Sequence, residues 1–259
     1  ALALAGQGAA VVVNDVGAAL DGSGRDAGPA EAVVAEVVCA GGRGLADATD
    51  VASIDGGRRA VARAIDAFGR IDIVVNNAGF AHGGGDVARP VEAELDALLA
   101  VHLKAALGTM AAAFPDMAGR GWGRIVNTVS EAALDARFVG GLGYGAAKAA
   151  LWSATLVAAT EGAAHGITVN GVSPGARTRM NDDLLDAGFR AGTSAELDLD
   201  PGHVAALVAY LASDEAGDIA GRIIHAAGGD VREYATARTS RTDLVERLRT
   251  ALDPVRPVS

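Results

Sequence analysis

Short apolar runs alternate along the chain with longer Ala- and Leu-rich stretches whose apolar residues recur at helical spacing. The short runs contain few polar residues, which is typical of parallel strands that helices cover on both faces. The pattern predicts strands at Ala10–Asp15, Gly44–Asp47, Ile71–Val75, Arg124–Thr128, Ile167–Val172 and Arg222–His225. It predicts helices at Pro29–Ala40, Ile54–Phe68, Val91–Phe114, Tyr144–Ala164 and Pro201–Ala212. This alternation favours an α/β fold in which a parallel sheet lies between two layers of helices.

Two loops are longer than such units need, and the pattern changes near the C-terminus. The segments Val16–Gly28 and Ser173–Leu199 both follow predicted strands, at the edge where open α/β sheets bind ligands. After Gly229 the chain becomes polar and Arg-rich, with one short helix predicted at Thr242–Leu252. We therefore expect one α/β domain over residues 1–230 and a polar C-terminal extension over residues 231–259.

The composition limits the class of partner. The chain has 259 residues, of which 50% are hydrophobic, so it can bury the core of one large domain. Its net charge is −10 and no block of Lys and Arg interrupts this acidity, so it lacks the basic surface that nucleic acid or an anionic membrane would need. No apolar stretch reaches the roughly 18 residues of a membrane span. We expect a small-molecule substrate and further copies of the same chain as partners.

Cys39 is the only cysteine, which excludes an internal disulfide and a Cys-rich metal site. We expect its side chain to be a small buried hydrophobe, and we expect no metal. A lone cysteine fits a reducing compartment, so we expect a cytoplasmic protein.

The strongest motif is Tyr144-Gly-Ala-Ala-Lys148, at the predicted start of a helix. Spacing of four residues puts the phenol and the ammonium on one helix face. Moving a tyrosine pKa from ~10 toward ~7 takes about 4 kcal/mol of preferential stabilisation of the anion, and a nearby cation acts in that direction. The chain has 20 Arg but only two Lys, Lys104 and Lys148. We infer that Lys148 supplies a compact charge that arginine could not replace.

Other candidate residues follow predicted strands. Ser130 could polarise a substrate oxygen, although a serine in this place is commonly just a turn residue. The run Asn76-Asn77-Ala78-Gly79 could tie loops together and let the backbone approach a flat ligand, or could simply form a turn. Asp15 could accept both ribose hydroxyls of NAD and repel the 2′-phosphate of NADP, or could open a turn.

In this order, and with Ser173-Pro174-Gly175 after them, these residues give the chain a resemblance to the short-chain dehydrogenases/reductases over about residues 1–230. The resemblance implies a Rossmann-like, doubly wound parallel sheet in three αβα layers. It implies NAD-dependent hydride transfer to or from a secondary alcohol or ketone. It implies that Tyr144 is the general acid/base, that Lys148 lowers the Tyr144 pKa and binds the nicotinamide ribose, and that Ser130 orients the substrate. The implied nicotinamide contacts and the start of the substrate lid fall on Pro174, Gly175, Thr178 and Met180.

Within the family, the chain looks most like the (3R)-hydroxyacyl-CoA dehydrogenase type, which implies a 3-hydroxyacyl-CoA-like substrate. The runs that carry this resemblance are Val13–Gly17, Val101–Lys104 and Arg177–Met180. His102 falls where most members have an asparagine that holds a proton-relay water, and a histidine can keep a relay or be a satisfied core residue. A homotetramer or homodimer built on Val91–Phe114 and Tyr144–Ala164 is also implied.

The sequence departs from the family pattern in three places. The Ser130–Tyr144 separation is one residue longer than usual, and we place the extra residue in the loop Ala132–Gly143. The adenine contact falls on either Thr49 or Asp50. The first strand and the glycine-rich phosphate turn would precede Ala1, so we expect an N-terminally truncated domain lacking a strand between those at Val11 and Ile71.

The truncation leaves alternatives open. The chain could be a catalytically inactive paralogue or a scaffold that does not bind a cofactor. NADP, with its 2′-phosphate held by a residue such as Arg25, is the less favoured cofactor because Asp15 opposes it. Arg137, Arg177 and Arg179 could meet an anionic tail such as that of CoA, or could be ordinary surface arginines.

Overall fold

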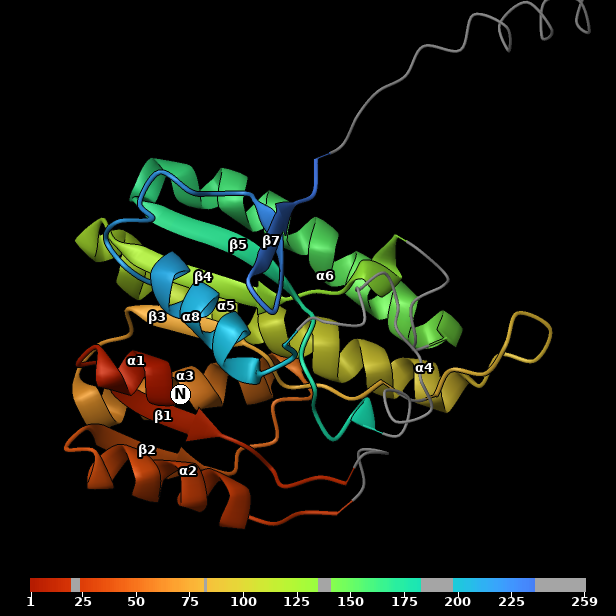
Figure 1. Cartoon of the computed structure of the whole chain (residues 1–259), viewed down its shortest axis with the longest axis horizontal. Coiled ribbons are helices and arrows are strands. Elements are labelled where there is room, and N and C mark those ends of the chain that lie inside the picture. The colour runs from red at the N-terminus through yellow and green to blue at the C-terminus, as the bar shows by residue number, and fades with distance from the viewer. Residues whose placement is uncertain (20–23, 82, 135–140, 183–197, 236–259) are drawn as a thin grey trace, which may run out of the picture.

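The computed structural model describes residues 1–19, 24–81, 83–134, 141–182 and 198–235. Its strands form two parallel groups, extended at one edge by an antiparallel hairpin (Figure 1). The first group pairs β1 (Ala10–Asn14) with β2 (Arg43–Asp47). The second has the order β3-β4-β5-β6-β7. Its strands are β3 (Ile73–Asn76), β4 (Gly123–Thr128), β5 (Ile167–Pro174), β6 (Ile223–Ala227) and β7 (Asp230–Glu233).

The sheet is interrupted between β1 and β3. Within the described residues β1 pairs with β2 alone and β3 with β4 alone, so one backbone edge of each of β1 and β3 has no strand beside it. This is the position at which the sequence predicted a missing strand. A pocket lined by Val12 of β1 and by residues 73–76 of β3 lies between the two groups.

Helices cover both faces of the strands, which gives the three-layer αβα fold that the sequence predicted (Figure 1). One layer contains α1 (Leu2–Gly6), α2 (Gly28–Cys39) and α8 (Pro201–Leu211). The other contains α3 (Ile54–Phe68), α5 (Ala105–Arg120) and α6 (Gly141–Gly162). The main buried cluster lies between this second layer and the sheet, and Met117, Ile125 and Val169 are at its centre.

Local sequence explains the bounds of α3, which match the prediction. Ser53 caps its first turn by accepting a hydrogen bond from the Gly56 N–H at 2.9 Å. Gly69 ends it in the left-handed conformation, with φ of 84°. Within the helix, a Cβ on Gly57 would lie 2.6 Å from the Ala105 carbonyl oxygen, so this glycine lets α3 and α5 approach closely.

The predicted helix Val91–Phe114 is three elements in the structure: α4 (Glu92–Leu99), a π-helical turn at Ala100–Lys104, and α5. A π turn fits one extra residue into the helix, which residue periodicity does not reveal. The prediction ended the helix before Pro115, but it continues to Arg120 and ends at Gly121. The whole run Glu92–Arg120 is long and apolar enough to cross a membrane by length and composition, yet α5 packs against α3 and the sheet.

One further expectation was wrong: Cys39 is exposed at the end of α2 rather than buried. Near the expected domain boundary at residue 230, β7 pairs with β6 from Asp230 to Glu233, and Tyr234 beyond it packs edge-on against Trp152. The predicted helix Thr242–Leu252 lies outside the described residues.

Candidate functional site

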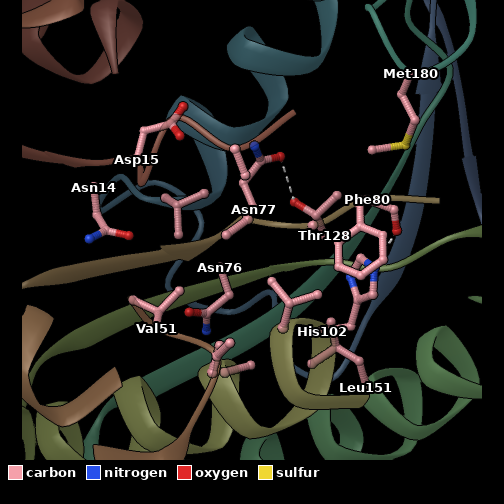
Figure 2. Close-up of a pocket in the computed structure, with 18 of the residues that line it drawn as sticks. Asn14, Asp15, Val51, Asn76, Asn77, Phe80, His102, Thr128, Leu151 and Met180 are labelled. Carbon is pink, nitrogen blue, oxygen red and sulfur yellow. Dashed lines mark hydrogen bonds between the residues drawn. The ribbon is translucent and has the colours of Figure 1, made fainter. Parts of the chain in front are cut away.

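One pocket of about 870 Å³ lies at the carboxyl ends of β1, β3, β4 and β5. Figure 2 shows Asn14 and Asp15 at one end of it, and Phe80, His102 and Met180 at the other. Loops that follow different strands converge here, as parallel sheets dictate. The sequence-predicted site residues that line the pocket are Asp15, Asp50, Asn76, Ala78, Gly79, His102, Ser130, Tyr144, Lys148, Pro174, Gly175, Thr178 and Met180. Among the described residues there is no cluster of three or more potential metal ligands.

Tyr144 lies in the first turn of α6, with its side chain turned toward the strand ends. Its hydroxyl is hydrogen-bonded to that of Ser130. Burial raises the pKa of the Tyr144 phenol, and the bond to Ser130 opposes this only in part. The phenol is therefore protonated at neutral pH. The resemblance implied a lowered Tyr144 pKa, whereas burial raises it.

Lys148, one turn further along α6, is buried and 3% exposed. Its Nζ donates a hydrogen bond to the Thr128 carbonyl oxygen at 2.6 Å and lies 5.6 Å from the centre of the Tyr144 ring. Burial lowers the pKa of Lys148 to about 7. Burial therefore acts on both groups of the motif: it lowers the pKa of Lys148 and raises that of Tyr144.

Ser130 has two roles. It precedes a short 3-10 helix (Glu131–Ala133) and caps it by accepting a hydrogen bond from the Ala132 N–H at 3.2 Å. Ser130 is thus a turn residue, as one of the two interpretations of the sequence had it. Because the same hydroxyl also contacts Tyr144, the turn places it where a substrate oxygen could meet both groups.

His102 is carried into the pocket by the π turn. Its Nε2 lies 2.8 Å from the Phe80 carbonyl oxygen, which can only accept, so Nε2 carries the proton. Its ring meets the Tyr144 ring edge-on at 5.4 Å. Burial, and then the charge of Lys148, lower the pKa of His102 to about 3.

This geometry argues against a proton relay through the imidazole. Nδ1 is buried without a hydrogen-bond partner among the described residues, so it can accept a hydrogen bond. Passing a proton on would require either an imidazolium, which the low pKa disfavours, or a proton from the Phe80 carbonyl, which has none. His102 is therefore an acceptor in this pocket.

A chain of buried polar side chains supports the floor of the site. The Thr109 hydroxyl donates to Asn76 at 2.7 Å, and the Asn76 amide donates to Asn127 at 2.8 Å. The Asn127 amide donates in turn to the Thr155 hydroxyl at 3.0 Å. Next to this chain, the Asn77 side chain accepts from the Thr128 hydroxyl at 3.1 Å (Figure 2). These bonds link α5, β3, β4 and α6, so they fix the strand ends relative to one another.

We expect Thr155→Val to lower the free energy of unfolding by about 1–3 kcal/mol, because it leaves the buried Asn127 amide with only the weak Met110 sulfur as acceptor. Thr160→Val is the matched control, since Thr160 on the same helix also bonds a carbonyl one turn back but is exposed. Urea denaturation of both variants checks the difference. Equal losses in the two variants would contradict the buried network.

At the other end of the pocket, Asp15 and Asp50 follow β1 and β2. The Asp15 carboxylate accepts the Gly17 N–H at 2.7 Å, and the Asp50 carboxylate pairs with Arg25 at 2.7 Å. Thr49, the alternative to Asp50, does not line the pocket, and its hydroxyl donates to the buried Asp47 carboxylate at 2.8 Å. The single-residue register after β2 was not readable from the sequence.

Sequence reasoning also missed two charged or titratable residues that line the pocket, Glu131 and His225. Glu131 lies next to Ser130, which was already assigned to the site. His225 lies in β6, whose apolar sequence is typical of the core. Arg137 lies outside the described residues.

The chain is similar to several known proteins. A family model described as enoyl-(acyl carrier protein) reductase matches residues 1–230. A short-chain type dehydrogenase/reductase of Mycobacterium tuberculosis is 39% identical over 91% of this chain and 79% of its own. A hydroxyacyl-CoA dehydrogenase of the same organism, ChsB1, is 37% identical over 89% of this chain and 73% of its own.

A crystal structure of a short chain dehydrogenase from Mycobacterium avium superposes with a TM-score of 0.77 at 38% identity, covering 99% of this chain and 90% of that one. Some relatives are much longer. The chain spans 25% of the length of the peroxisomal hydratase-dehydrogenase-epimerase of Saccharomyces cerevisiae, to which it is 36% identical.

Proposed function

Because the chain belongs to the short-chain dehydrogenase/reductase family, we propose that Tyr144, Lys148 and Ser130 carry its chemistry, with NAD as cofactor and a 3-hydroxyacyl thioester as substrate. Family membership makes the protein an oxidoreductase that uses a nicotinamide cofactor. The observation that carries the residue assignment is the Tyr144–Ser130 hydrogen bond beside the buried Lys148, in a pocket that reaches Asp15.

The residues present fit the two ends of a dinucleotide. Asp15 offers a carboxylate at a strand end, which suits a ribose diol, and Lys148 offers a buried donor that suits the other ribose. The described residues lining the space between them include no glycine-rich helix N-terminus of the kind that holds a pyrophosphate. The fit thus rests on the adenosine and nicotinamide ends.

The bound nicotinamide supplies the hydride for reduction or accepts it in oxidation. In carbonyl reduction the protonated Tyr144 hydroxyl donates a proton to the substrate oxygen, and in alcohol oxidation it takes one back. The Ser130 hydroxyl holds the same oxygen, so the reacting carbon keeps a fixed orientation. Lys148, once charged, stabilises the phenolate that is left, and its bond to Thr128 fixes its direction.

NAD is favoured over NADP by the charges at the adenosine end. The Asp15 carboxylate lines the pocket and would repel a 2′-phosphate. Arg25, the cation that could attract that phosphate, is held by Asp50. Together these groups favour a free 2′-hydroxyl.

We expect Asp15→Ala to raise kcat/KM for NADP⁺ relative to that for NAD⁺ by about tenfold or more, since removing a repulsion of ~1.4 kcal/mol changes an equilibrium tenfold. Asp55→Ala is the control, because Asp55 is exposed on α3 and away from the pocket. Steady-state kinetics with both cofactors checks the ratio. An unchanged ratio would remove Asp15 from the cofactor site.

The proposed substrate class is suggested by the relative named as a hydroxyacyl-CoA dehydrogenase. Arg179 lines the pocket near Met180 and could meet the phosphates of a CoA tail.

We further propose a homotetramer or homodimer in which α5 and α6 bury exposed apolar residues such as Leu107, Leu156 and Val157. We also propose a cytoplasmic location, which would keep the Cys39 thiol reduced.

The test is NADH formation by the full-length protein with a 3-hydroxyacyl-CoA, compared with a secondary alcohol that lacks the CoA moiety. We expect a higher kcat/KM for the thioester. Activity with neither compound would favour the inactive scaffold, and equal activity would remove CoA from the recognised part of the substrate.

A further inference from the structure

A buried imidazole that the proposed mechanism does not use lines the same pocket as the catalytic groups. His225 in β6 is 2% exposed, and neither ring nitrogen has a hydrogen-bond partner among the described residues. Its Nδ1 lies 3.7 Å from a carboxylate oxygen of Glu131. Both residues line the pocket. Burying a polar ring without a hydrogen-bond partner is unfavourable, so the position of His225 indicates a role beyond packing.

The pair joins two segments of the site that are far apart in sequence. Glu131 directly follows Ser130, and its N–H donates to the Ser173 hydroxyl at 3.1 Å. Ser173 faces His225 across the β5–β6 ladder. The imidazole also lies against the next loop, since a Cβ on Gly175 would be 3.3 Å from its Cε1.

Neighbouring charges point to Glu131 as the carboxylate that faces the imidazole. Arg232 is opposite His225 in the β6–β7 ladder, but its Nε donates to the Asp230 carboxylate at 2.7 Å. The distance of 3.7 Å from Nδ1 to Glu131 is within ion-pair range, though longer than a direct hydrogen bond of about 3.2 Å.

We propose that Glu131 and His225 are positioning residues, in which the carboxylate keeps a proton on Nδ1 of the imidazole. The pair holds the Pro174–Gly175 loop at a fixed distance from the turn that carries Ser130. This inference rests on the proposed function, because it gives the loop and the serine their roles at the nicotinamide end. A carboxylate that fixes the tautomer and the orientation of a histidine is a general device for placing neighbouring groups.

A double-mutant cycle tests whether the two residues act as a unit. The variants are Glu131→Leu, His225→Phe and the double variant in the full-length protein, with Glu131→Gln as the conservative change that keeps an acceptor. We expect each single variant to lose about tenfold in kcat/KM, the double variant to lose no more than either, and Glu131→Gln to remain near wild type. Multiplicative losses, about 100-fold in the double variant, would overturn the proposal.

A second readout does not depend on turnover. The ¹⁵N NMR shifts of the His225 ring report which nitrogen carries the proton. We expect protonated Nδ1 in the wild type and a change of tautomer in Glu131→Leu, and identical shifts in both would also overturn the proposal. If His225→Phe does not fold, His225→Gln replaces it in the cycle. Activity that survives in Tyr144→Phe would instead overturn the proposed function itself, so the two failures are distinguishable.

Discussion

Tyr144→Phe is expected to lower kcat by about 10²–10⁴-fold, because it removes the group that exchanges a proton with the substrate oxygen. The phenyl ring stays in place, so its edge-on contact with His102 is kept and cofactor affinity changes little. The loss should therefore appear in kcat with a nearly constant dissociation constant for NADH. Steady-state kinetics and fluorescence titration of the full-length protein measure the two quantities.

Tyr210→Phe is the matched control for this variant. Tyr210 is 44% exposed on α8 and does not line the pocket, so its hydroxyl can be removed without touching the site. A kcat of Tyr144→Phe within twofold of that of Tyr210→Phe would show that the phenol is not the proton donor.

Lys148→Met is expected to stabilise the folded protein at pH 6 while it abolishes activity. Lys148 has a pKa of about 7 in the folded chain, against 10.5 for an unperturbed lysine, a difference that corresponds to ~5 kcal/mol. Below pH 7 the folded state carries the full penalty of a buried charge. As the pH rises from 7 to 10.5, the unfolded lysine holds more protons than the folded one, so the stability of the wild type rises.

The measurable quantity is the difference in the free energy of unfolding between Lys148→Met and the wild type. It should be largest at pH 6 and decline by ~2 kcal/mol between pH 7 and pH 9, as ionisable groups common to both proteins cancel. Lys104→Met is the control, since Lys104 is the chain's other lysine and is exposed. A pH-independent difference in both variants would mean that burial does not perturb Lys148.

The charge states of Tyr144 and Lys148 thus differ from those that the spacing of the two residues suggests. Burial favours a neutral lysine and a protonated tyrosine, and the cation that would stabilise a phenolate is available only when Lys148 takes up a proton. We infer that a negative group near Lys148 in the bound state would restore its charge, because an opposite charge raises a lysine pKa.

Much of the fold and the candidate site followed from the sequence. The alternation of apolar runs and helical stretches indicated the parallel sheet and its helix layers, because both patterns are local. The order of Asp15, Asn76, Ser130 and Tyr144 indicated the pocket, because each follows or faces a strand end, and parallel strands bring those ends to one edge. The interruption between β1 and β3 lies where the sequence pattern led us to expect it.

Only the tertiary structure decided the rest. Three features depend on packing between segments distant in sequence: the π turn that turns His102 inward, the position of Asp50 in the pocket lining, and the meeting of Glu131 with His225. The pKa values of Tyr144 and Lys148 depend on how much water reaches them, which the i, i+4 spacing cannot report. The sequence by itself determined that the residues after the parallel strands meet in one pocket, while tertiary packing added the others and burial determined which groups are charged there.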